Sequence, residues 1–130
     1  MEPPFKAIEG ISTASVGDRK ILRRVALEEG ATREGATDFP ETIAAVVDVE
    51  TTGLSLDEDG IIELALRRIH FDHLGIVTYI EQPYVWLEDP GMPVPLDISR
   101  LTGITDYDVE GERIDEDEVL ELLYEADIII

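Results

Sequence analysis

The sequence predicts a single α/β domain, and three observations lead to that prediction. Its 130 residues are enough for one domain and no more. Three β-rich segments occupy residues 43–80 and are joined by short turns without intervening helical patterns, which predicts an antiparallel meander. Acidic residues at 115–118 then open a stretch with apolar residues at helical spacing, and a new apolar run begins near its end.

Composition supports a folded but strongly acidic domain. The chain is 44% apolar and carries 30 acids against 10 bases, for a net charge of −20. Residues 1–34 are balanced in charge, so the whole excess falls on residues 35–130. Such a surface repels phosphate backbones, which argues against nucleic-acid binding by charge alone. It leaves open a nucleic-acid enzyme whose acids hold divalent cations, because bound ions reverse the local field.

Three absences in the sequence bound the protein's environment. The chain has no cysteine, so it has neither a disulfide framework nor a thiolate metal site. No apolar run approaches the roughly 18–20 residues that span a bilayer. The first residues lack the basic start and apolar stretch of a secretory signal. We therefore expect a cytoplasmic protein with no membrane contact.

The first half of the chain divides into a lead-in and a meander. Residues 1–40 are expected to be an N-terminal lead-in, with a short amphipathic helix over 20–27 that stops at Gly30 and a linker over 30–40. The domain proper is expected over 41–130. The continuous apolar run at 43–47 predicts a strand buried on both faces. Two further strands are predicted over 61–71 and 76–80, each preceded by a turn.

The second half predicts an extended segment, two helices and the start of a strand. Residues 83–95 are punctuated by prolines and are expected to be extended. A short helix is predicted over 96–102, ended by Gly103. A second helix is predicted to begin at the acids of 115–118, which suit a helix N-terminus. Residues 127–130 begin an apolar strand at which the sequence stops, so we expect a truncated domain.

Asp48 and Glu50 are the strongest candidate for a chemical site. Residues two apart on a strand project from the same face, with Cα atoms roughly 6–7 Å apart. Two carboxylates so placed can share one or two hard cations such as Mg²⁺ or Mn²⁺, and a metal pair can activate water for phosphodiester hydrolysis. Thr51 and Thr52 would supply donors beside the metals, and Gly53 would allow a close approach. The alternative is a carboxylate pair at a fraying strand end that accepts backbone amides from the turn.

Other polar and aromatic patterns are expected to be structural. The same acid-x-acid spacing recurs in turns and at a helix start, where we expect solvated charge: Asp57/Asp59, Asp106/Asp108, Asp115/Asp117 and Glu116/Glu118. His70 and His73 flank a predicted hairpin without a third imidazole or a thiol, so surface histidines are expected. Tyr84 and Trp86 could stack a base, but their proline-rich surroundings favour a role in covering the sheet edge.

Several segments together resemble the DnaQ-like (DEDD) 3′–5′ exonucleases. Residues 47–54, VDVETTGL, resemble the first motif of this family, which includes the proofreading epsilon subunit of bacterial DNA polymerase III. Residues 60–65 resemble its second strand, and residues 98–105 the segment that packs against the terminal nucleotide. Residues 126–130 resemble the strand that leads into the second motif. The resemblance implies a ribonuclease H-like mixed sheet in which the start of a fourth strand runs parallel to the first.

The resemblance also implies roles for individual residues. Asp48 and Glu50 would ligate two Mg²⁺ or Mn²⁺ ions. The residues implied in substrate binding lie in two segments: Thr51, Thr52, Gly53, Leu54, Leu101 and Thr102. Of these, Leu54 would pack on the terminal base or sugar. For Leu101 and Thr102, the alternative is a helix end packed on the core.

The family's later motifs mark where the match stops. A third carboxylate in a His-Asn-x-x-Phe-Asp stretch and a fourth behind a His or Tyr are not matched in these residues, and Asp127 lies too early to replace them. Two carboxylates should bind Mg²⁺ weakly, so the chain alone is expected to be inactive.

The expected function is a fragment of a metal-dependent 3′–5′ exonuclease. It would release nucleoside monophosphates from the 3′ end of single-stranded DNA or RNA, in DNA replication or repair. The alternative is a non-catalytic acidic interaction module with the same fold. Residues 106–127 hold eleven acids and only one base, Arg113, so this region is either a solvated face or a docking surface for a basic partner such as a polymerase subunit.

Overall fold

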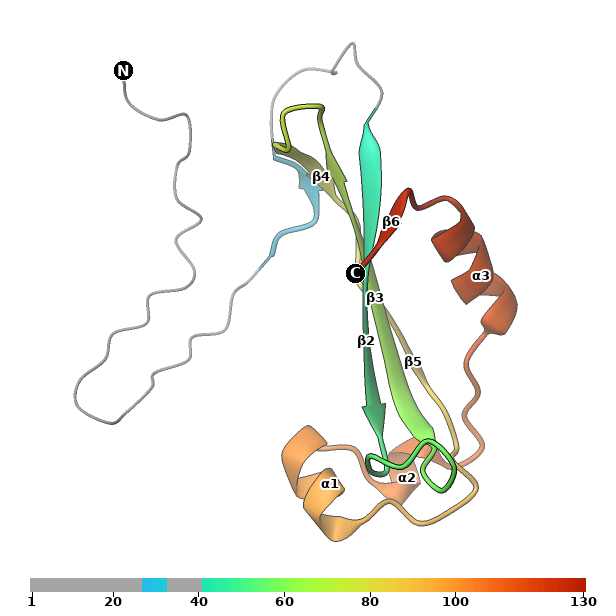
Figure 1. The fold of residues 1–130 in the computed structure, drawn as a ribbon. Coiled ribbons are helices and arrows are strands. Elements are labelled where there is room, and N and C mark those ends of the chain that lie inside the picture. The colour runs from blue at the N-terminus through green and yellow to red at the C-terminus, as the bar shows by residue number, and fades with distance from the viewer. Residues whose placement is uncertain (1–26, 33–40) are drawn as a thin grey trace, which may run out of the picture.

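The computed structural model describes residues 27–32 and 41–130, which form one twisted sheet flanked by three helices (Figure 1). The strands follow the order β1 (Gly30–Ala31), β4 (Val77–Ile80), β3 (Ile61–Phe71), β2 (Thr42–Thr51) and β6 (Ile128–Ile129). In addition, β5 (Tyr84–Leu87) pairs with β3. The helix expected over 20–27 lies outside the described residues except for Leu27. Among the described residues, no helix has both the length and the apolarity needed to cross a membrane.

The expected antiparallel meander is confirmed in β2 (Thr42–Thr51), β3 (Ile61–Phe71) and β4 (Val77–Ile80). The first strand is longer than its apolar run of 43–47, because backbone pairing with β3 continues through Glu50, which lies opposite Glu63. The register shifts between Glu50 and Thr51, which marks a β-bulge. Asp48 and Glu50 therefore lie within the paired strand.

The expected parallel strand is also confirmed. β6 (Ile128–Ile129) pairs in parallel with β2 at Ala44 and Ala45. The Asp127 carboxylate accepts a hydrogen bond from the Ile43 amide at 2.9 Å, and the Asp127 amide donates to the Ile43 carbonyl. Asp127 thus anchors β6 at the end of β2 remote from Glu50, which agrees with its exclusion as a metal ligand.

Two strands were not predicted. Gly30 and Ala31, the first residues of the expected linker, form β1 (Gly30–Ala31) and pair with Ile80 and Tyr79 of β4. Within the expected extended segment, β5 (Tyr84–Leu87) pairs with β3. Tyr84 and Trp86 stack with ring centroids 5.8 Å apart. These two rings belong to a strand of the sheet itself.

The helices lie at one end and along one face of the sheet. α1 (Leu96–Thr102) ends at Gly103, whose φ of 82° favours glycine, as expected. α2 (Asp106–Val109) was not predicted and begins with a capping box between Thr105 and Asp108. α3 (Glu116–Tyr124) begins at the expected acids, with Asp115 as its N-cap.

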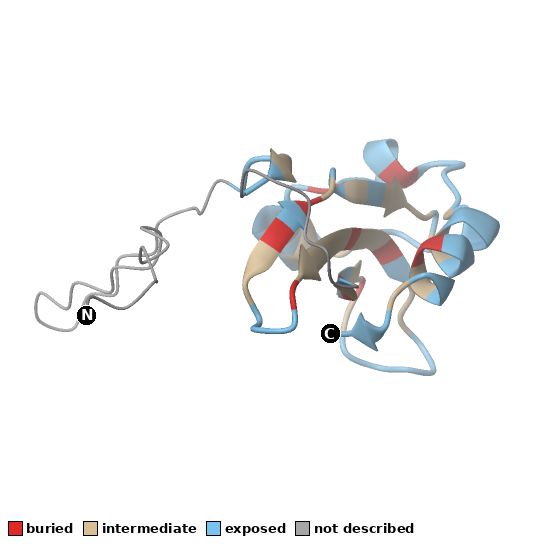
Figure 2. Cartoon of the chain, turned by 90° about the horizontal axis from the view of Figure 1, so that it is seen from above, coloured by how far each residue is buried: buried red, intermediate tan, exposed pale blue. Residues whose placement is uncertain are grey.

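Two sets of contacts attach the helices to the sheet. Val94, Ile104 and Val109 are buried against Ile62 of β3. They hold the α1–α2 segment at the end of the sheet where β2 ends (Figure 1). Figure 2 shows that most of the helical surface is exposed. α3 is tied to β5 where the Trp86 indole donates to the Glu118 carboxylate at 3.0 Å. The α3 residues that pack inward are at helical spacing around the buried Leu122.

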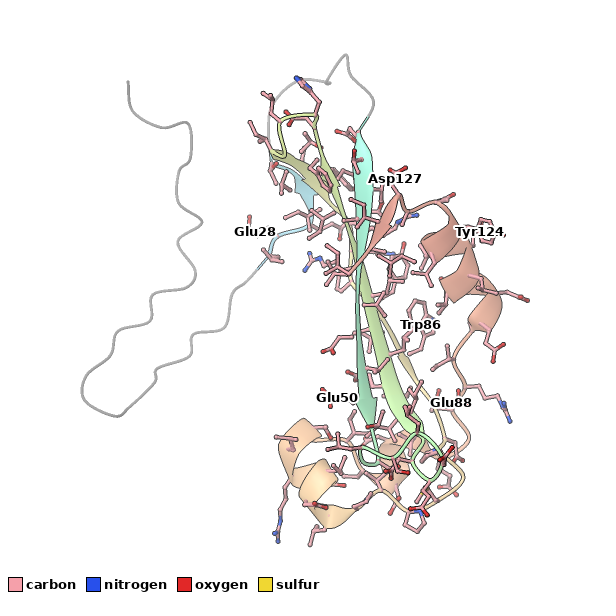
Figure 3. The ribbon with its side chains drawn as sticks, viewed as in Figure 1. Glu28, Glu50, Trp86, Glu88, Tyr124 and Asp127 are labelled. Carbon is pink, nitrogen blue, oxygen red and sulfur yellow. The ribbon has the colours of Figure 1, made fainter. Side chains whose placement is uncertain are left out.

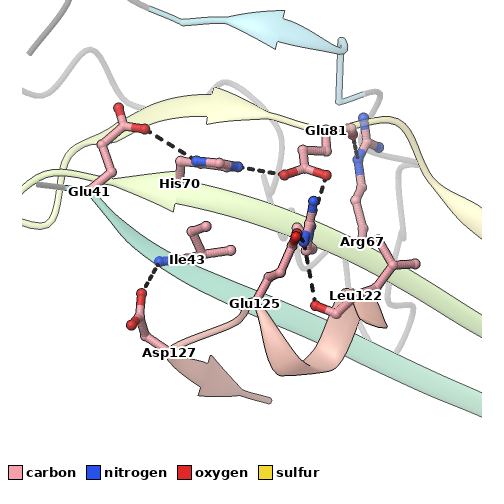
Figure 4. Close-up of polar contacts among 9 residues, drawn as sticks. Glu41, Ile43, Arg67, His70, Glu81, Leu122, Glu125 and Asp127 are labelled. Carbon is pink, nitrogen blue, oxygen red and sulfur yellow. Dashed lines mark hydrogen bonds and ion pairs between the residues drawn. The ribbon is translucent and has the colours of Figure 1, made fainter. Parts of the chain in front are cut away.

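A polar network joins β3, β4 and α3 at the other end of the sheet (Figure 4). Arg68 Nε donates to Glu81 at 2.9 Å, and its Nη1 reaches Glu125 at 2.5 Å. His70 lies between Glu81, at 2.6 Å, and Glu41, at 3.2 Å. The expectation of a surface His70 is therefore wrong, because its ring packs edge-on against Tyr79 and is mostly buried between carboxylates.

Candidate active site

Asp48 and Glu50 lie on the face of the sheet that α3 does not cover. Trp86 contacts α3 and lies opposite Leu64, so the alternating residues Glu63 and Ala65 project from the other face. Asp48 is paired with Ala65 and Glu50 with Glu63, which places both carboxylates on that same face. Figure 3 shows Glu50 and Trp86 pointing to opposite sides of the sheet. The same-face prediction for the two acids is confirmed by this register.

Asp48 is not held by the turn that follows the strand. It is exposed, and its Oδ1 accepts only a local hydrogen bond, from the Val49 amide at 3.1 Å. Glu50 is half-buried. Among the residues that the structure describes, no backbone amide of the turn donates to either carboxylate. The alternative of a strand end that caps its own turn is therefore not supported.

Glu63 adds a third carboxylate that the sequence analysis did not single out. Side chains directly opposite on antiparallel strands have Cβ atoms about 4.5–5.5 Å apart, and like charges there destabilise the sheet. Within the described part of the chain, neither Glu50 nor Glu63 has a hydrogen-bond or ion-pair partner. A cation between them would relieve this repulsion. Counting register back from the loop at 53–60 could have identified Glu63, but the bulge shifts that count.

The loop after β2 is closed by its own side chains. The buried Thr52 hydroxyl donates to Asp59 at 2.9 Å and accepts from the Gly60 amide at 3.0 Å. Its amide donates to the Gly60 carbonyl. The expectation that the Thr52 hydroxyl is a donor beside the metals is not met, because this hydroxyl already has both partners inside the loop.

Gly53 is required by the same loop. A Cβ at this position would lie 2.4 Å from Oδ2 of Asp59. That carboxylate is fixed, since it also accepts the Ser55 amide at 2.8 Å. The close approach that Gly53 permits is therefore made by Asp59, which is a loop anchor and not the solvated charge expected. The Thr51 hydroxyl donates to the Gly53 carbonyl at 2.5 Å.

The predicted apolar contacts to a ligand are free of the core. Leu54 and Leu101 are 102% and 81% exposed, so the alternative that Leu101 packs on the core is wrong. Thr102 differs, because its hydroxyl donates to the Ile98 carbonyl at 2.9 Å and accepts from the Ile104 amide at 3.1 Å. The side chain of Thr102 thus ends α1.

The acid-x-acid copies outside β2 are mostly helix and loop anchors. Asp106 accepts the Val94 amide at 2.7 Å, and Asp115 accepts the Glu118 amide at 3.0 Å. Asp108 accepts both the hydroxyl and the amide of Thr105, and these hydrogen bonds lower the pKa of Asp108. All three are exposed, as expected for solvated charge, and each also accepts a backbone hydrogen bond. They differ from Asp48 in that their hydrogen bonds cap a helix or close a loop, whereas Asp48 accepts only the amide of the next residue among the described hydrogen bonds.

The donor set of the candidate site suits a hard cation but is small. Carboxylate oxygens are the ligands that Mg²⁺ and Mn²⁺ prefer. Asp48 and Glu50 could hold such an ion, with Glu63 beside them. Across residues 27–32 and 41–130, no group of three or more Asp, Glu or His side chains converges as a metal site. The chemistry of the ligands fits, and their number falls short.

Known proteins resemble part of this chain. DNA polymerase III PolC-type of Streptococcus thermophilus (strain ATCC BAA-491 / LMD-9) is 36% identical over 76 residues, which are 58% of this chain and 5% of that protein. Its counterpart in Streptococcus mutans serotype c is 37% identical over 76 residues, with the same coverage. The chain therefore spans about 5% of the length of these curated relatives.

Solved structures of exonuclease I also resemble the chain. One is 21% identical, has a TM-score of 0.45, and covers 64% of this chain and 18% of the other. The Escherichia coli enzyme in complex with a dT13 oligonucleotide is 20% identical with a TM-score of 0.44 and the same coverage. The profile of the RNase T exonuclease family matches residues 45–126, well over half of the chain. The chain therefore belongs to this DnaQ-like exonuclease family, and its described part has a mixed sheet with antiparallel and parallel strands.

Proposed function

We propose that this chain contributes the first metal-binding strand of a 3′–5′ exonuclease that hydrolyses the terminal phosphodiester of single-stranded DNA or RNA and releases nucleoside monophosphates. One observation carries the proposal. Asp48 and Glu50 project from one open face of β2, beside Glu63, which has no hydrogen-bond or ion-pair partner among the described residues, within the segment that matches the exonuclease family. Charge that is left without a cation in a folded sheet supports a role in binding one.

Each residue has a defined part in this proposal. Asp48 and Glu50 hold Mg²⁺ or Mn²⁺. The bound cation offsets the negative potential of the carboxylates, which would otherwise repel a phosphodiester. A bound ion of this kind would supply Lewis acidity and an activated water. Leu54 and Leu101 offer apolar contact to the terminal base or sugar, and the backbone of residues 51–53 positions the nucleotide. Thr52 and Thr102 act by fixing the loop and the end of α1.

The relatives guide the proposed setting. Curated relatives are named DNA polymerase III PolC-type, and an exonuclease I structure contains a dT13 oligonucleotide. We accordingly place the activity in DNA replication or repair in the cytoplasm, with single-stranded DNA as the first substrate to test and an RNA 3′ end as the second. Polymerase subunits are the proposed protein partners.

A cation titration followed by thermal unfolding tests the metal site. Specific binding should stabilise the wild-type chain by RT ln(1 + [L]/Kd) on addition of Mg²⁺ or Mn²⁺. Asp48→Asn should abolish that shift, whereas Asp57→Asn, at an exposed acid on the loop, should retain it. Equal shifts in all three proteins would contradict the proposed site.

A nuclease assay tests the reaction. A single-stranded oligonucleotide labelled at its 5′ end should be shortened stepwise from the 3′ end when the full set of family carboxylates is present in the polypeptide. Because two carboxylates give Mg²⁺ too few ligands, we expect no Asp48-dependent turnover from these 130 residues alone. Turnover by this chain that is lost in Asp48→Asn would overturn the expected inactivity while supporting the nuclease.

A second candidate is a non-catalytic acidic interaction module. The absence of a third converging ligand among the described residues favours it. It predicts that Mg²⁺ or Mn²⁺ changes the thermal stability of the wild type and of Asp48→Asn to the same extent. The same titration therefore decides between the two functions.

A further inference from the structure

The outer face of α3 combines charge that has no structural task with exposed apolar side chains. Of the acids at its start and along its length, Asp115 caps the helix, Glu118 accepts from Trp86, and Glu125 pairs with Arg68. Within the described residues, Glu116, Asp117 and Glu121 have no such partner. These three charges are therefore not explained by the packing of the helix.

The apolar residues of α3 also fall into two groups, one that packs on the sheet and one that is exposed. Leu122 is buried toward the sheet, whereas Leu120 and Tyr124 are 54% and 90% exposed. They are four residues apart and so lie one above the other on the helix surface. Tyr124 projects from the side of α3 remote from the sheet (Figure 3). We call Glu116, Asp117, Leu120, Glu121 and Tyr124 the outer α3 face.

This composition works against helix stability. Asp117 and Glu121 are like charges at i and i+4, which repel each other on a helix surface. The last turn has no basic residue, although cations are favoured at that end of the helix dipole. A cationic partner would remove both penalties.

We propose that the outer α3 face is a docking surface for a protein segment that carries Lys or Arg around apolar side chains. Charge complementarity identifies this class of partner, since residues 106–127 hold eleven acids and one base. The same field repels nucleic acid and anionic membrane surfaces. Leu120 and Tyr124 supply an apolar centre with a charged rim, the usual arrangement of a protein interface. The inference does not depend on the exonuclease chemistry.

Fluorescence anisotropy with a defined probe tests the proposal. The probe is a fluorescein-labelled amphipathic peptide of Lys and Leu at helical spacing, titrated with the whole chain at about 0.15 M salt. The triple variant E116Q/D117N/E121Q and the double variant Leu120→Ser with Tyr124→Ser should each raise Kd by about fivefold or more, as expected for contacts at the centre of an interface.

Matched controls separate a defined face from general acidity. E28Q/E29Q/E58Q removes the same number of charges at exposed positions outside residues 106–127, and Leu56→Ser with Leu74→Ser removes two exposed leucines. Both controls should change Kd by less than about twofold. Equal weakening by the two charge triples, or equal binding of a peptide with Ser in place of Leu, would overturn the proposal. Circular dichroism of each variant confirms that a loss of binding is not a loss of fold.

Discussion

The two ends of the long β2–β3 ladder treat their acidic side chains in opposite ways. At one end, Glu81 lies 2.6 Å from His70 and 2.9 Å from Arg68, and Arg68 also binds Glu125. At the other end, Glu50 and Glu63 face each other without a cation from the described chain. The first end is an ion-pair network that needs nothing further. The second end has a charge imbalance that the proposed Mg²⁺ or Mn²⁺ would relieve.

The pKa values of Glu81 and Arg68 reflect their pairing in the network. Burial alone would raise the pKa of Glu81, but hydrogen bonds from His70 and Arg68 and the charge of Arg68 outweigh it, so the pKa of Glu81 is lowered. Burial likewise opposes the charge of Arg68, yet its hydrogen bonds to Glu125 and Glu81 leave the pKa of Arg68 raised. A mostly buried charge is thus stable here because it has matched partners.

Removing Arg68, the cation of the network, should leave Glu81 without its arginine partner, so that both ends of the ladder have unbalanced carboxylates. We expect this substitution to have the largest effect on stability. Arg68→Ala leaves the mostly buried Glu81 without its guanidinium partner and removes the ion pair with Glu125 at the end of α3. The free energy of unfolding should therefore fall by about 2 kcal/mol or more. Urea denaturation measures it. Arg113→Ala removes an exposed arginine 4.0 Å from Glu88 and should change stability by less than about 0.5 kcal/mol. Similar losses in both variants would contradict a special role for the network.

Gly53→Ala tests the loop at the site end. The new Cβ would meet a carboxylate that Thr52 and Ser55 hold in place, so we expect a loss of about 1–2 kcal/mol. The loss should be smaller when Asp59→Ala is introduced first, because the clashing group is then gone. If Gly53→Ala lowers stability equally in the wild type and in Asp59→Ala, the loss does not come from a clash with the Asp59 carboxylate. Thermal unfolding of the four proteins in the cycle decides this.

Acidification should weaken the network end. Because the pKa of Glu81 is lowered in the folded chain, its contribution is complete above its ordinary value of 4.5 and is lost as pH falls through the folded pKa. Stability measured by urea denaturation from pH 7 downward should therefore fall below about pH 4.5. The pKa values of Asp89 and Asp108 are lowered too, by hydrogen bonds from Gly111 and Gly91 and from Thr105. Glu81→Gln should therefore flatten the acid slope only in part, and an unchanged slope would count against Glu81.

Glu63→Gln should remove the imbalance at the site end and gives the smallest effect. Without divalent cations, relief of the repulsion with Glu50 should raise the free energy of unfolding by about 0.5 kcal/mol. In Mg²⁺ or Mn²⁺ the stabilisation by the ion should be smaller than in wild type. Glu58→Gln, on the exposed loop, is the control. A Glu63→Gln protein that is less stable without metal would show that Glu63 has a structural role.

Local patterns predicted the elements whose signals are local. The meander, the end of α1 at Gly103 and the start of α3 at Asp115 follow from turns, apolar spacing and caps, and all are confirmed. The shared face of Asp48 and Glu50 follows from strand alternation alone. α2 has only four residues, and its capping box joins Thr105 to Asp108, an acid that was interpreted as solvated charge.

The features that were not predicted from the sequence depend on which strands and segments pair in the folded chain. β5 lies among prolines and is a strand because β3 extends beyond β4 and offers it a partner. His70 is mostly buried, and its carboxylate neighbours Glu81 and Glu41 come from other segments of the chain. Glu63 meets Glu50 through a register that the bulge offsets. None of these partners is within reach of a local sequence window.

The loop that follows β2 is held by internal hydrogen bonds, and this affects the binding free energy of any ligand that contacts it. Ordering a backbone residue costs about 1–2 kcal/mol in conformational entropy. Here Thr52, Asp59 and Gly60 hold the base of the loop in place during folding, before a ligand arrives. A molecule that contacts the exposed Leu54 therefore meets a preorganised loop, and its binding free energy is not reduced by the cost of ordering this part of the backbone.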